Sequence, residues 1–89
     1  MNKVELQKVL KDITKKIHTL EEKLHTKSLE ADRLLDKRMR SVITLDESTK
    51  LHKKIMKAYE VRDNLAKEIE TLRNEKRAMI DNWRIQQLL

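Results

Sequence analysis

The most constraining feature of this sequence is a series of aliphatic residues spaced alternately four and three positions apart. It begins at Leu6 and continues without interruption to Leu24. Such heptad spacing is typical of a coiled coil, because it keeps one stripe of an α-helix against a neighbouring helix. The first half of the chain is therefore predicted to be one long helix that packs against another. The stripe consists of Leu6, Leu10, Ile13, Ile17, Leu20 and Leu24, and its frame continues through Lys27, Ala31, Leu34 and Arg38.

A second stripe with the same spacing occupies the other half of the chain, in a different frame. The first frame would reach positions 45, 48 and 52, whereas the second stripe starts at Leu51 and Ile55. In a single continuous helix, the apolar stripe would have to shift to a different face of the helix between Arg38 and Leu51. The second stripe consists of Leu51, Ile55, Ala58, Arg62, Leu65, Ile69, Leu72, Lys76, Met79 and Trp83.

The segment between the stripes, RSVITLDEST at positions 40–49, has the features of a turn. It places three β-branched residues, Val42, Ile43 and Thr44, in a row. Residues 44–47 then match a capping box, in which Thr44 accepts a hydrogen bond from the amide of Glu47 and the Glu47 side chain reaches back. We predict helices over about residues 2–41 and 45–88, with a turn at about 42–45. A continuous helix that dimerises along its length is the alternative.

A turn at this position would place the two stripes face to face. Core residues would then pair so that their numbers add to 89, as in Leu6 with Trp83 and Ala31 with Ala58. The predicted fold is thus all-α, a long antiparallel two-helix coiled-coil hairpin, and residues 1–89 form a single domain. A hairpin has one seam to bury, so we expect it to assemble into a dimeric four-helix bundle or to dock on a partner.

Four cations occupy positions of the stripes, and Lys27 would face Arg62 across the seam. We expect their long aliphatic stems to carry the charges outward to solvent. The alternative is that they pair with carboxylates of another chain and fix its register. The four residues are Lys27, Arg38, Arg62 and Lys76.

Composition excludes several kinds of functional site. The chain has no Gly, which rules out a glycine loop for phosphates, and no Cys, which rules out disulfides and thiolate metal sites. No apolar run approaches the roughly 20 residues of a membrane span, and the first residues do not resemble a signal peptide. We therefore expect a cytoplasmic protein with no cofactor.

No arrangement of residues in the sequence indicates catalysis, so we do not expect an enzyme. Ser41 and Ser48 have no plausible base to activate them. The residues His18, Glu22 and His25 share one helix face and could ligate a metal. That face lies outside the seam and is expected to be hydrated, so we predict no metal site.

Positive charge is concentrated around the predicted turn. Residues 37–57 contain seven basic and two acidic residues, a net charge of +5, out of +6 for the whole chain. A basic patch of this kind attracts phosphates, anionic lipid or an acidic protein surface. A solvated lysine face that only maintains solubility is the alternative. The predicted contact patch consists of Arg33, Lys37, Arg40, Lys50, Lys53, Lys54 and Lys57.

The end of the hairpin opposite the turn is predicted to be a protein interface. The C-terminal segment AMIDNWRIQQLL carries more apolar side chains than one seam can bury, and tryptophan and methionine are enriched at interfaces. The alternative is that these residues only close the core of the hairpin. The predicted interface consists of Val4, Val9, Met79, Ile80, Trp83, Ile85, Leu88 and Leu89.

These features predict a small non-enzymatic regulator or adaptor that binds a protein partner, a second copy of itself as a homo-oligomer, or both. Compact basic helical proteins of this type are common among phage and bacterial regulators. The second hypothesis is a helical bundle that binds nucleic acid through Lys50, Lys53, Lys54 and Lys57. No aromatic residues interleave this face for base stacking, which favours the first hypothesis.

Overall fold

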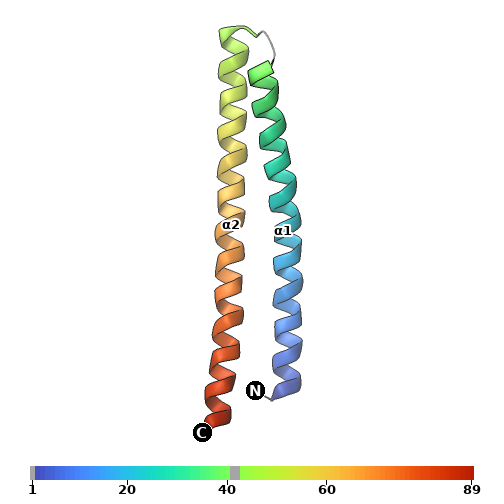
Figure 1. The fold of residues 1–89 in the computed structure, drawn as a ribbon, viewed down its shortest axis with the longest axis vertical. Coiled ribbons are helices and arrows are strands. Elements are labelled where there is room, and N and C mark those ends of the chain that lie inside the picture. The colour runs from blue at the N-terminus through green and yellow to red at the C-terminus, as the bar shows by residue number, and fades with distance from the viewer. Residues whose placement is uncertain (1, 41–42) are drawn as a thin grey trace.

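The computed structural model describes residues 2–40 and 43–89, which form two long antiparallel helices. Helix α1 spans Lys3–Arg40 and helix α2 spans Leu45–Leu88. They lie side by side along their whole length, with both termini at the same end of the molecule (Figure 1). The molecule measures 67 × 16 × 14 Å. This confirms the predicted two-helix hairpin and contradicts a continuous helix.

The connection between the helices agrees with the predicted turn. Thr44 has extended backbone angles, φ −70° and ψ 164°, and its Oγ1 accepts a hydrogen bond from the amide of Glu47 at 3.2 Å. Its carbonyl accepts the next helical bond, from the amide of Ser48 at 2.9 Å. Among the described residues, the second bond of the capping box, from the Thr44 amide to the Glu47 carboxylate, is not formed. The predicted end of the first helix, at residue 41, and residue 42 of the turn lie outside the described residues.

The start of α1 has a cap that the sequence interpretation missed. The Asn2 side chain accepts a hydrogen bond from the amide of Glu5 at 2.8 Å, and its own amide nitrogen donates to the Glu5 carboxylate at 3.3 Å. Asparagine is a preferred N-cap because its short side chain satisfies an amide that has no partner within the helix. The helix therefore starts one residue later than predicted, after Asn2.

The core follows the two predicted stripes. Every buried residue belongs to one of them, and no polar or charged side chain is buried among the described residues. Ile13, Ile17 and Ile69 form the centre of the core, with partly buried hydrophobic residues packed around them. Nearer the turn, Ala31 is fully buried, and its predicted partner Ala58 is also in the core. The buried residues are Leu6, Ile13, Ile17, Ala31, Leu51, Ile55, Ala58 and Ile69.

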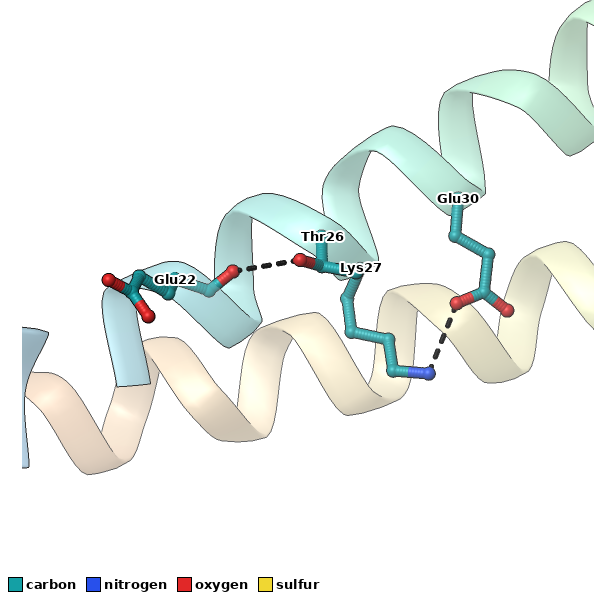
Figure 2. Close-up of polar contacts among 4 residues, drawn as sticks. All are labelled: Glu22, Thr26, Lys27 and Glu30. Carbon is teal, nitrogen blue, oxygen red and sulfur yellow. Dashed lines mark hydrogen bonds and ion pairs between the residues drawn. The ribbon is translucent and has the colours of Figure 1, made fainter. Parts of the chain in front are cut away.

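Two cations in the middle of the stripes direct their charges to solvent, as predicted. Lys27 Nζ lies 3.1 Å from a carboxylate oxygen of Glu30, one turn along its own helix (Figure 2). Arg62 pairs with the adjacent Asp63 at 3.3 Å, and its guanidinium stacks over the Tyr59 ring at 4.6 Å. Each cation is thus paired with a carboxylate on its own helix. Lys27 and Arg62 therefore do not bury two like charges against each other in the seam.

The other two stripe cations link the helices. Lys76 Nζ donates to Thr14 Oγ1 at 3.0 Å, and Arg38 Nη1 lies 3.0 Å from His52 Nδ1. These contacts join α1 to α2 beside the apolar seam. No helix among the described residues is long and apolar enough to cross a membrane.

Candidate functional site: the open end, the basic tip and a side groove

The open end is the end of the hairpin that holds both chain termini, and it exposes several large apolar side chains. Val4 is 75% exposed, Ile85 55%, Leu88 86% and Leu89 101%. The C-terminal end of α2 projects beyond the start of α1 (Figure 1), and Leu88 and Leu89 at this end are almost fully exposed. The fold therefore brings these four predicted interface residues to one end of the molecule without covering them.

The other four predicted interface residues are partly buried. Val9 and Met79 pack against the central core cluster, and Ile80 and Trp83 are also of intermediate exposure. The predicted interface thus divides into an exposed rim and an inner layer of partly buried side chains, which can contribute to the hairpin core and to an interface.

Trp83 lines a small hollow at the open end. The hollow has a volume of about 140 Å³ and is lined by Leu6, Met79, Asn82, Trp83 and Gln86. The indole Nε1 is buried, and within the described residues it has no acceptor. An unpaired buried donor is unfavourable by about 1–3 kcal/mol, so the packing at this end is not fully satisfied within the single chain.

The basic tip is the end of the hairpin that holds the turn. All seven predicted patch residues are exposed: Arg33, Lys37, Arg40, Lys50, Lys53, Lys54 and Lys57. Arg40 pairs with Asp36 at 2.7 Å, whereas the ion pairs of residues 2–40 and 43–89 include none of the others. In an antiparallel pair, residues that directly precede a stripe residue lie on the same side of both helices. Each of four lysines does so, and they therefore face one direction: Lys37, Lys50, Lys54 and Lys57. The tip therefore presents cations that no carboxylate neutralises.

The tip also exposes apolar side chains that the sequence interpretation did not single out. Met39 is 78% exposed, Met56 53% and Leu45 84%. They lie outside the heptad stripes, so no periodic signal distinguishes them from ordinary surface residues. The apolar surface of the molecule is therefore not restricted to the open end.

A groove of about 530 Å³ runs along one side of the seam in the open half of the molecule, which is the half that contains the open end. An ion pair between Arg73 and Glu21 at 2.9 Å and the bond from Lys76 to Thr14 cross it. Four of its residues are basic and two are acidic. The sequence interpretation missed this groove, because its residues come from two segments that are distant in the sequence. The groove is lined by Thr14, Ile17, His18, Glu21, Arg73, Lys76, Arg77, Ile80, Asp81 and Arg84.

The structure assembles no catalytic or metal-binding arrangement from the residues that it describes. Ser48 contacts Arg38 at 3.4 Å, and a guanidinium cannot act as a general base. Within residues 2–40 and 43–89, no three His, Cys, Asp or Glu side chains are placed to hold a metal ion.

Comparison with known proteins does not assign the chain to a family. No family model matches it, and neither a curated protein nor a solved structure is significantly similar. The function is therefore inferred from the surfaces of the hairpin alone.

Proposed function

We propose that the protein is a small non-enzymatic regulator or adaptor that acts by binding another protein. In this proposal the open end supplies the apolar contacts and the basic tip supplies polar contacts to an acidic surface. The observation that carries the proposal is the group of exposed apolar side chains at the open end, Val4, Ile85, Leu88 and Leu89. Large apolar side chains gathered at one place on a small protein mark interaction sites.

The small core gives independent support. Among residues 2–40 and 43–89, eight are buried, because two helices share a single seam. A chain of this size buries a modest part of its surface and gains stability when a partner covers more of it. Trp83 is suited to such an interface, since tryptophan combines a large apolar area with an N–H donor. Covering the open end would also protect Leu88 and Leu89 from water.

The open end can be tested by replacing its exposed residues without disturbing the core. We expect Ile85→Ser/Leu88→Ser to lower retention of a copurifying protein partner by about tenfold or more, because apolar anchors dominate interface energy. A matched control is Met39→Ser/Met56→Ser, which removes two exposed apolar side chains at the tip. Affinity purification with quantitative mass spectrometry measures the retention.

Two results would contradict this proposal. One is recovery of nucleic acid without any protein, and the other is a partner that both double variants retain equally. Sedimentation over a range of protein concentrations separates self-association from binding to a different protein. A mass that rises to that of a dimer, and that Ile85→Ser/Leu88→Ser returns to a monomer, would identify the partner as a second copy.

Nucleic-acid binding is the second candidate, and the exposed lysine face of the tip favours it. Lys50, Lys53, Lys54 and Lys57 are all exposed and could neutralise several phosphates. Binding of this type weakens steeply with salt, because each phosphate contact releases a counterion. Affinity that falls linearly on a log–log salt plot, and is lost when the four lysines become glutamates, would support this candidate over the first.

A further inference from the structure

The open half of the hairpin has an uneven distribution of charge that its near-zero net charge conceals. The groove along one side of its seam collects Arg73, Lys76, Arg77 and Arg84, against Glu21 and Asp81. Arg73 and Glu21 neutralise each other at 2.9 Å. The groove therefore retains the exposed guanidinium groups of Arg77 and Arg84 and the ammonium group of Lys76, against the single carboxylate of Asp81.

The base of the same groove is apolar. Ile17 is buried and Ile80 is partly buried, and both line the groove between the charged side chains. His18 and Thr14 border it from α1, whereas the arginines border it from α2. An occupant must therefore combine an apolar strip for the isoleucines with negative charge for the arginines.

We propose that this groove binds an acidic amphipathic helix of a partner protein, which completes a three-helix arrangement. Side chains three and four positions apart lie on one face of a helix, so a single helix can present an apolar strip flanked by carboxylates. Arginine is well suited to this role, because its planar guanidinium binds a carboxylate through two parallel hydrogen bonds. This inference rests on the proposed function and specifies the chemistry of the partner.

The composition of the groove argues against two other occupants. Nucleic acid would use the cations but would leave the apolar base unmatched, and among the described residues no Phe, Tyr or Trp ring lines the groove for base stacking. A second copy of the chain that docked by the same groove would bring arginines of both copies together. Like charges brought together in this way disfavour the complex.

The proposal can be tested with two synthetic helical peptides of about 21 residues, three heptads each. Both carry leucine at the a and d positions. The flanking positions hold glutamate in one peptide and lysine in the other. We expect the glutamate peptide to bind at least about tenfold more tightly, as measured by fluorescence anisotropy of the labelled peptide.

A charge-reversal variant tests the location of the site. Arg77→Glu/Arg84→Glu is expected to weaken binding of the glutamate peptide by about tenfold, because it replaces two attractive pairs with two repulsive ones. Both side chains are exposed, so the helices remain folded, which circular dichroism checks. The matched control, Lys23→Glu/Lys67→Glu, makes the same change in net charge at exposed positions outside both the groove and the basic tip, and is expected to weaken binding by about twofold at most.

Methyl NMR of isoleucine-labelled protein then locates the bound peptide. We expect the signals of Ile17 and Ile80 to shift, whereas that of Ile55, near the tip, stays in place. The groove proposal is overturned if the peptide does not bind, if both double variants weaken binding equally, or if the shifts are confined to the tip. Full displacement of the peptide by single-stranded DNA would also overturn it.

These outcomes are separate from a failure of the proposed function. A protein partner that is lost with Ile85→Ser/Leu88→Ser but retained with Arg77→Glu/Arg84→Glu would uphold the open end as an interface. The same result would remove the groove from that interface. Loss of the partner with both variants, together with peptide binding in the groove, would support both proposals.

Discussion

The two halves of this hairpin use the same heptad spacing and differ in what fills it. In the open half, three isoleucines form a cluster surrounded by Val9, Leu20, Leu24, Leu72 and Met79. In the tip half, the seam contains the small residues Ala31 and Ala58 and the cations Lys27, Arg38 and Arg62. The comparison teaches that the open half is packed by a cluster of large aliphatic side chains, whereas the tip half combines buried Leu51 and Ile55 with a layer of small residues.

The largest expected effect tests this difference with two isoleucines that are almost equally buried. Ile69 is 4% exposed within the central cluster, and Ile55 is 3% exposed near the tip. We expect Ile69→Ala to lower the free energy of unfolding by about 3 kcal/mol and Ile55→Ala by about 2 kcal/mol. The reason is that large neighbours around Ile69 hold the cavity open, whereas the helices at the tip can close on it. Urea denaturation followed by circular dichroism measures both values.

Equal losses for these two variants would contradict the comparison. They would mean that the two halves pack equally tightly despite their different side chains. Ile85→Ala, at a position that is 55% exposed, serves as the control for losing an isoleucine from the surface. Its effect on stability is expected to remain within about 0.5 kcal/mol.

The next effect concerns the alanine layer of the tip half. Ala31 has no exposed surface, so Ala31→Leu must force the helices apart or adopt a strained rotamer. We expect a loss of about 2 kcal/mol in the free energy of unfolding. Ala66→Leu, at an exposed position of α2, provides the matched control and is expected to change stability little. Stability that is unchanged or higher in Ala31→Leu would show that the helices are not in close contact at this layer.

The smallest effect compares the two helix caps. Thr44 caps α2 at the turn and Asn2 caps α1 at the open end, each through a bond to the amide three residues later. We expect Thr44→Ala to cost about 1 kcal/mol. Asn2→Ala should cost less, because the first turn of a terminal helix can fray without opening the seam. Thermal unfolding followed by circular dichroism measures both. A larger loss from Asn2→Ala would indicate that the start of α1 is more tightly coupled to the core than the turn.

Much of the fold could be predicted because it depends on local periodicity. All eight buried residues lie in the two heptad stripes, and the change of frame together with Thr44 located the turn. Asp36 and Arg40, four positions apart on α1, form an ion pair at 2.7 Å, as helical spacing favours. Asp63 pairs at 3.3 Å with the adjacent Arg62, whose guanidinium is directed out of the seam.

The candidate sites could be predicted only in part. The basic side chains of the tip are exposed, and so are Val4 and Leu88 at the open end, in agreement with the surfaces predicted from the sequence. The partial burial of Val9 and Ile80 does not follow from the spacing, since both lie outside the two stripes. Their burial depends on the crossing of a second helix, which a periodic pattern along one chain does not describe.

The sequence by itself determined that this chain forms two long helices, where they turn, and which residues lie between them. These properties arise from the period of the α-helix and from the chemistry of a few capping residues, both local. Only the tertiary structure decided which charges gather on the same surface. Arg73 and Glu21 are far apart in the sequence and lie 2.9 Å from each other across the groove. The arginine-lined groove exists because antiparallel packing brings together faces of two helices that are distant in the sequence. A count of charge along the chain does not reveal this arrangement.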